Sequence, residues 1–149
     1  MSTRLDGSRC EAELLGWRRA VVAMAAGVLL VLLATAGWLR PSPRGYGTHQ
    51  GLGLPPCTIV QLWGRRCPAC GMTTSWAWLM RGRVDRAFEA NVGGAMLGLA
   101  TMVATPWFGW SALRGKWWFG PPSDVWLAVG GCVWLAVTMT DWLVRLLAA

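Results

Sequence analysis

The stretch AVVAMAAGVLLVLLATAGWL, residues 20–39, is a run of twenty residues without a charge. A helix rises about 1.5 Å per residue, so this run covers roughly 30 Å, the thickness of the hydrocarbon core of a bilayer. Arg18 and Arg19 precede the run and Arg40 follows it, as interfacial anchors do. Helices in soluble cores are seldom this long and this free of charge. The stretch therefore predicts a transmembrane helix.

Two further runs predict two further spans. Residues 92–113 are free of charge, and Pro106 inside this run predicts a kink, which membrane helices tolerate. The third predicted span covers residues 125–145. Asp141 and Arg145 in its last turns are four residues apart, so we expect them to pair where the helix reaches the interface. The sequence thus predicts an all-α integral membrane protein with three transmembrane helices.

The composition agrees with a membrane protein. Of the 149 residues, 54% are hydrophobic and 14% are charged, whereas roughly a quarter of the residues in a soluble domain are charged. The length allows a single membrane domain, residues 1–149. The net charge of +7 is spread around the ends of the predicted spans. This distribution favours contact with anionic lipids of the bilayer, and we expect no nucleic acid as partner.

Two features of the topology stay open. Residues 34–36 (Ala-Thr-Ala) resemble a signal-peptide cleavage site, but residues 37–39 extend the apolar run past that site. Six basic residues flank the spans on each side when Arg65 and Arg66, in the middle of a loop, are left out. The positive-inside rule therefore favours neither orientation. Either an oxidising or a reducing compartment remains open for the cysteines.

Residues 40–91 form a long loop between the first two predicted spans. Its first part, residues 41–56, is rich in Gly and Pro, is expected to be irregular and contains the only histidine, His49. Residues 71–80 (GMTTSWAWLM) predict a helix that is too short to span a bilayer. This short helix is expected to lie in the interface, or to be re-entrant and covered by the flanking spans.

Cys67 and Cys70, in the sequence Cys-Pro-Ala-Cys, are spaced so that a turn brings their sulfurs together. Three outcomes are open. As a metal site, the pair would take Cys57 as third ligand and His49 as fourth, a set that suits tetrahedral zinc. As a redox dithiol, the pair resembles the quinone-coupled membrane enzymes that form disulfides, with Cys57 as partner thiol. Otherwise the three cysteines are inert, or two of them form a structural disulfide.

Other positions have simpler interpretations. Cys132 lies within the third predicted span and is expected to act as a small hydrophobic residue, and Cys10 has no partner in view. Gly94 and Gly98 permit close contact between helices, which we expect within the chain, with a homo-oligomer as the alternative. Asn91 precedes the second predicted span and is a plausible N-terminal capping residue.

Two carboxylates, Asp85 and Glu89, share one helical face and are a pattern seen in acid–base catalysis. Arginines surround them in the sequence, which favours a charged interfacial turn instead. With a single histidine, the chain has no nucleophile–His–acid set, and it has no phosphate-binding loop. We therefore assign no catalytic residue, unless Cys67 and Cys70 are redox-active.

The loop also carries a family signature. A cysteine followed after about ten residues by CPxCGxT, a short helix and an Asn before a span resembles the bacterial membrane-protein family called domain of unknown function 2752. The resemblance covers residues 52–107, and its specific core is CPACGMTTS. This chain departs from it at Thr74, where many members have Arg, and at Val92, where a Pro is frequent. The matching residues are Cys57, Cys67, Pro68, Cys70, Gly71, Thr73, Gly82, Ala87 and Asn91.

The resemblance implies a small integral protein of a bacterial inner (cell) membrane and no particular reaction. The sequence is typical of a structural or accessory membrane protein with a cysteine-stabilised or metal-binding loop, and zinc is one metal it would suit. The alternative is a membrane thiol–disulfide oxidoreductase that uses the Cys-x-x-Cys pair. A subunit of a transporter or secretion complex would have the same sequence features.

Overall fold

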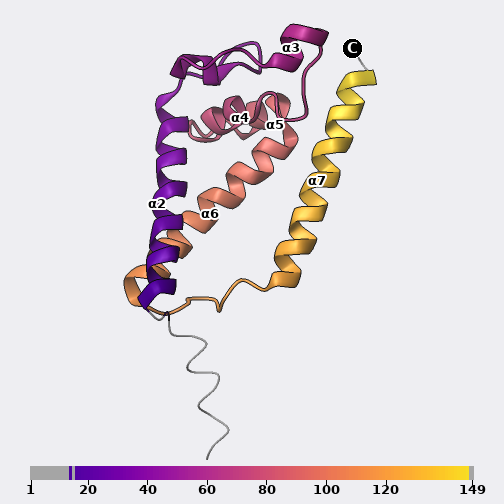
Figure 1. Ribbon diagram of the computed structural model, residues 1–149. Helices are drawn as coiled ribbons and strands as arrows, with labels where there is room; N and C mark the ends of the chain where they lie inside the picture. The colour runs from indigo at the N-terminus through magenta and orange to yellow at the C-terminus, as the bar shows by residue number, and fades with distance from the viewer. Residues whose placement is uncertain (1–13, 15, 148–149) are drawn as a thin grey trace, which may run out of the picture.

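A computed structural model describes residue 14 and residues 16–147. Over this part of the chain the fold is all-α, without strands, as predicted. Three helices are long and apolar enough to cross a membrane, and Figure 1 shows them as the long rods of the molecule. They are α2 (Gly16–Trp38), α6 (Val92–Arg114) and α7 (Asp124–Leu147). The three predicted spans are thereby confirmed, with bounds that differ by a few residues. Cys10 lies outside the described residues.

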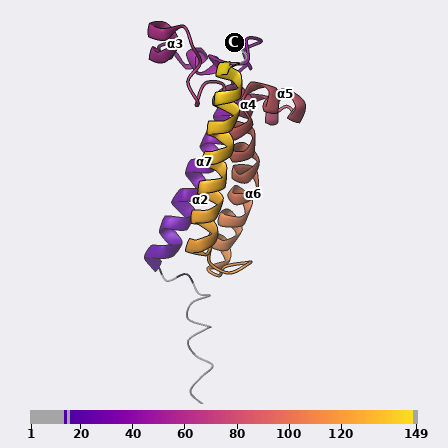
Figure 2. The same ribbon diagram turned by 90° about the vertical axis from the view of Figure 1, so that its right-hand side faces the viewer.

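Four short helices lie between α2 and α6. They gather at one end of the molecule, where α2 ends, α6 begins and α7 ends (Figures 1 and 2). We refer to residues 40–91 as the loop region. Its elements are the 3₁₀ helix η1 (Thr48–Leu52) and the helices α3 (Thr58–Trp63), α4 (Met72–Leu79) and α5 (Val84–Ala90). Helix α4 is the short helix expected at residues 71–80, and it packs against α2, α5 and α6.

Three elements of the loop region were not expected. The Gly- and Pro-rich segment contains η1, the apolar segment after Cys57 forms α3, and the segment interpreted as a charged turn forms α5. Helix α5 is held by Ala87, which is fully buried in a cluster with Leu79 and Ala95. Its carboxylates pair with arginines on the exposed side, Asp85 with Arg83 at 3.1 Å and Glu89 with Arg86 at 3.4 Å. The two carboxylates are therefore paired with nearby arginines, as the sequence indicated.

Glycines allow α6 to approach its neighbours closely. A Cβ atom at Gly98 would lie 2.5 Å from the Leu79 side chain of α4, and one at Gly94 would lie 2.9 Å from the Met72 backbone. Gly93, on another side of α6, has no room for a Cβ atom beside Thr138 of α7. The close contacts at Gly94 and Gly98 are therefore made within the chain.

Helix α7 has fewer protein neighbours than the other two long helices. In its most apolar 18-residue window 6% of the residues are buried, against 28% in α6 and 22% in α2. The Trp134 indole donates a hydrogen bond of 2.8 Å to the Gly93 carbonyl, and Arg145 pairs with Asp141 at 2.9 Å as predicted. Most of the α7 surface is thus left for lipid.

Candidate metal centre

Three cysteines of the loop region converge. Cys57 precedes α3, and Cys67 and Cys70 lie in the turn that leads into α4. The Cys57 and Cys67 sulfurs are 3.7 Å apart, and the Cys67 and Cys70 sulfurs are 3.1 Å apart. All three sulfurs lie within 4.8 Å of one another, and each cysteine is half-buried. The structure therefore unites the three thiols that the sequence singled out.

Gly71 fixes the path of the chain directly after Cys70. Its φ of +97° lies in the left-handed region, where a side chain is strained. A Cβ atom would also lie 2.6 Å from the Ala90 carbonyl oxygen and 2.8 Å from the Gly45 carbonyl oxygen. Two distant backbone segments thus approach the same glycine. Only glycine can connect the cysteine turn to α4 in this arrangement.

Asn91 ties the cysteine turn to α6. Its side-chain oxygen accepts a hydrogen bond of 2.6 Å from the Gly94 backbone N–H, which confirms its expected capping role. Its side-chain nitrogen donates to the carbonyls of Pro68 at 2.9 Å and Cys70 at 3.1 Å. Asn91 is 4% exposed, so these bonds are shielded from solvent. One amide therefore begins a transmembrane helix and fixes the turn that bears two thiols.

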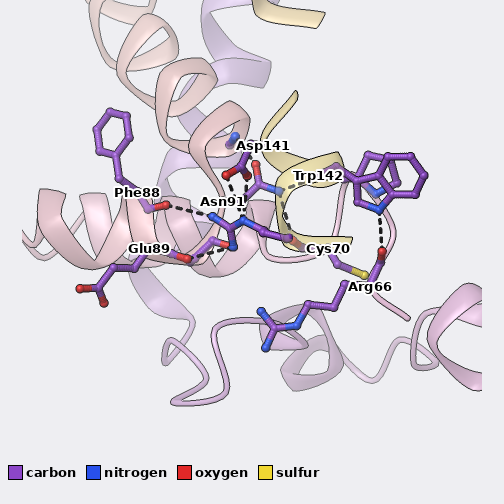
Figure 3. Close-up of polar contacts among 11 residues, drawn as sticks. Arg66, Cys70, Phe88, Glu89, Asn91, Asp141 and Trp142 are labelled. Carbon is purple, nitrogen blue, oxygen red and sulfur yellow. Dashed lines mark hydrogen bonds and ion pairs between the residues drawn. The ribbon is translucent and has the colours of Figure 1, made fainter. Parts of the chain in front are cut away.

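The last turns of α7 also reach the loop region. Arg145 donates to the carbonyls of residues 88–90, at the end of α5, over distances of 3.0 to 3.3 Å. The Trp142 indole donates a bond of 2.8 Å to the Arg66 carbonyl, next to Cys67. Figure 3 shows this junction, with Asn91 between Asp141 and Cys70. All three transmembrane helices thus contact the structure around the cysteines, because α2 packs on α4.

A buried pair of hydroxyls connects the first part of the loop region to α4. The Thr48 and Thr74 hydroxyl oxygens are 2.7 Å apart, and Thr48 also accepts a bond of 3.0 Å from the Ser42 backbone N–H. Thr74 is completely buried. Position 74 is where many members of the family that the sequence resembles have Arg. Threonine here holds η1 against the beginning of α4.

The surroundings affect the cysteine thiols differently. The backbone N–H of Val60, in the first turn of α3, is the main cause that lowers the pKa of the Cys57 thiol. Burial, followed by the contact with Cys67, raises the pKa of the Cys70 thiol to about 12. Without a metal ion, Cys70 therefore keeps its proton at neutral pH. A metal ion bound by all three sulfurs would release that proton.

Cavities lie on both sides of the cysteine turn. One, of about 290 Å³, is lined by Cys57, Cys67 and Cys70 together with Tyr46 and His49. The ring nitrogens of His49 do not belong to the group of ligand atoms within 4.8 Å of one another. His49 therefore borders the thiols, and its role as fourth ligand remains a prediction. The other cavity, of about 350 Å³, lies between the turn and the last turns of α7.

The sulfur geometry is compatible with two kinds of chemistry. Zinc–thiolate bonds of about 2.3 Å in a tetrahedron separate the sulfurs by about 3.8 Å, close to the distance between Cys57 and Cys67. A disulfide requires about 2.0 Å. The distance between Cys67 and Cys70 lies between these values, and the three cysteines are free thiols. Either state would require the Cys67 and Cys70 sulfurs to move by about 1 Å relative to one another.

The remaining motif residues have structural positions. The Pro68 carbonyl is a partner of Asn91, and the half-buried Thr73 lines the 290 Å³ cavity. Gly82, with a φ of +71°, forms the turn between α4 and α5. The sequence did not indicate the contact of Thr48 with Thr74 or those of Arg145 with the end of α5. Their partners are 26 and 55–57 residues away along the chain, and no local pattern announces such contacts.

These features define a small helical membrane protein with a cysteine turn fixed at the beginning of its second span. A sequence model of the family described as "Protein of unknown function (DUF2752)" matches residues 57–105. The match contains the three cysteines, α4, α5 and part of α6. It confirms the resemblance that the CPACG motif indicated. No curated protein and no solved structure matches this chain.

Proposed function

We propose that this chain is a multi-pass protein of a bacterial cell membrane that binds a metal ion through Cys57, Cys67 and Cys70. The observation that carries the proposal is the convergence of the three sulfurs within 4.8 Å. Two of these thiols are adjacent in the sequence motif, but Cys57 comes from a separate segment. Zinc suits this ligand set, because thiolate-rich sites with one imidazole are common for that ion.

A metal ion held by the three thiolates would need a fourth ligand, and the 290 Å³ cavity that the cysteines and His49 line has room for one. His49 would provide that ligand after a rotation of its side chain, or a water molecule would. With His49 as ligand, the ion would connect η1, α3 and the cysteine turn, and its role would be structural. The protein would then be an accessory component of the membrane, alone, as a homo-oligomer or as a subunit of a larger complex.

A second candidate function is thiol–disulfide exchange, which the 3.1 Å contact between the Cys67 and Cys70 sulfurs favours. Closing that disulfide releases two electrons and two protons. A membrane quinone would take up both and become a quinol. Cys57, with its sulfur 3.7 Å from that of Cys67, would act as the partner thiol. A substrate dithiol would reduce the Cys67–Cys70 disulfide again by exchange and would itself be oxidised to a disulfide, so the pair would cycle and metal would not be retained.

Metal analysis of the protein purified in detergent separates the two functions. We expect about one zinc per chain in the wild type, and its loss in Cys57→Ser and Cys67→Ser. Cys132→Ser is the matched control, because this exposed thiol of α7 is outside the cluster. A metal-free wild type in which the Cys67–Cys70 pair is oxidised by an added quinone would contradict the metal site and favour the second function.

The variant His49→Ala tests the fourth ligand. If His49 coordinates the ion, we expect zinc affinity to fall by at least about 10–100-fold, the loss seen when a residue that only supports a ligand is removed. Unchanged affinity would assign the fourth position to a water molecule. Cobalt substitution gives an independent readout, because the absorption spectrum of cobalt changes when a nitrogen ligand is lost.

A further inference from the structure

A second, apolar cleft adjoins the cysteine cavity. It has a volume of about 310 Å³ and lies between α2, η1, α4 and the first half of α6. Leu32 and Leu97 at its rim are partly exposed on helices long enough to span a membrane. In a bilayer, the exposed faces of α2 and α6 beside the cleft would contact lipid. Its apolar lining consists of Leu32, Ala36, Leu39, Leu52, Leu54, Met72, Trp76 and Leu97.

Three polar residues complete the lining, Thr35, His49 and Thr73, and the Thr35 hydroxyl already donates to the Val31 carbonyl of its own helix. His49 and Thr73 line both the cleft and the cysteine cavity, so the two spaces share a wall. Among the described residues, neither the His49 ring nor the Thr73 hydroxyl has a hydrogen-bond partner. Both side chains are half-buried. Polar groups that lack a partner within the protein and border an apolar cleft can bond to a ligand that enters it.

The charges around the cleft restrict the chemistry of that ligand. No aspartate, glutamate, lysine or arginine lines it. An anionic or cationic group there would lack a counter-ion and would be desolvated at a high cost. A hydroxyl or carbonyl group, in contrast, would accept or donate one hydrogen bond to each of the two side chains. An uncharged polar group therefore fits.

The geometry points to a binding site for a membrane amphiphile with one apolar chain and an uncharged hydroxyl or carbonyl group. The chain lies in the cleft between α2 and α4, and the polar group lies at His49 and Thr73, next to the cysteine cavity. An imidazole has two nitrogens, so coordination of a metal by one leaves the other for this ligand. The site exists whether or not the cysteines hold a metal.

Photolabelling of the full chain in lipid nanodiscs tests this site. The probe is a long-chain fatty alcohol with a diazirine in its chain, and a probe with the same chain and a phosphate group is the comparison. We expect the alcohol to label peptides of α2 and α4 around the cleft, and excess unlabelled alcohol to suppress this labelling. Labelling spread evenly over α2, α6 and α7, or equal labelling by the phosphate probe, would overturn the proposal.

Two variants locate the site. Leu32→Trp fills the mouth of the cleft, and Val31→Trp is its matched control, because Val31 is 63% exposed and does not line the cleft. We expect labelling to fall at least about fivefold, or about 1 kcal/mol, in Leu32→Trp alone. His49→Phe should lower it while zinc content is measured in parallel. Equal labelling of the two tryptophan variants would contradict the cleft as the site.

Discussion

Two regions of the molecule are rich in apolar residues but are packed differently. One is the junction between the loop region and α6, and the other is the long helix α7. At the junction, Gly71 and Gly98 leave no room for a Cβ atom beside their neighbours, and Asn91 both donates to and accepts from the backbone. Along α7, Gly130 and Gly131 face open space. The residues of the junction must fit against protein neighbours, whereas most residues of α7 need only be apolar enough to face lipid. Hydrophobicity alone does not distinguish these two requirements.

The largest difference is expected for alanine substitutions of glycine in the two regions. Gly71→Ala places a side chain at a positive φ, which costs about 1–2 kcal/mol, and between two carbonyl oxygens, which adds to that cost. Gly130→Ala is expected to be neutral or to stabilise α7 by up to about 1 kcal/mol. Thermal unfolding in detergent, followed by tryptophan fluorescence, measures both. Equal unfolding temperatures would contradict the difference between the regions.

The variant Asn91→Ala should have the next largest effect. It leaves the Pro68 and Cys70 carbonyls and the Gly94 N–H without partners at a buried position, at a cost of about 2–3 kcal/mol. Because the cysteine turn is then less fixed, zinc affinity should also fall, by about tenfold or more. Asn91→Asp keeps the capping oxygen and loses the donor, so it should restore the α6 contact but not the affinity.

A smaller effect is expected at the end of α7. Arg145→Gln removes donors to the carbonyls of residues 88–90 and the partner of Asp141. The groups are partly exposed, so we expect a loss of about 1–2 kcal/mol. Hydrogen exchange should increase at the end of α5. Arg65→Gln, which removes one exposed bond of 3.4 Å, is the control and should leave exchange in α5 unchanged.

The smallest effect is expected for Asp85→Asn, on the exposed side of α5. The hydrogen bond from Arg83 lowers the pKa of the Asp85 carboxyl. A lowered pKa stabilises the fold above the ordinary value of about 3.9, and this contribution disappears as pH falls through the lowered pKa. The variant should therefore unfold slightly earlier than the wild type near neutral pH and together with it at about pH 2. A difference that persists in strong acid would exclude the ion pair as its cause.

The three spans could be predicted because bilayer thickness acts on a contiguous run of sequence. Asn91 and the pair of Asp141 and Arg145 could also be predicted, since their roles depend on spacings of three and four residues. Helix α5 could not, because it buries only two small residues, Ala87 and Ala90, in a segment rich in charge. Its stability comes from α4 and α6, not from its own pattern.

The cysteines of the candidate site could be predicted from the sequence, but the contacts that hold the cysteine turn in place could not. Cys57, Cys67 and Cys70 were selected by type and spacing, and their sulfurs converge. The carbonyl oxygens of residues 45 and 90 leave no room for a side chain at Gly71, and they approach it only in the folded chain. The hydrogen bond between Thr48 and Thr74 likewise joins two threonines that no sequence motif connects. Such contacts depend on tertiary structure and leave no local signature.

The position of Arg145 at the end of α7 bears on how the protein is made. The chain is synthesised from the N-terminus, and Arg145 follows Cys70 by 145 − 70 = 75 residues. At about 5–20 residues per second, the cysteine turn is translated roughly 4 to 15 s before the side chain that secures the end of α5. During that interval the end of α5 lacks the bonds from Arg145. A metal bound as proposed above would thus have time to reach the thiols before the last helix is inserted.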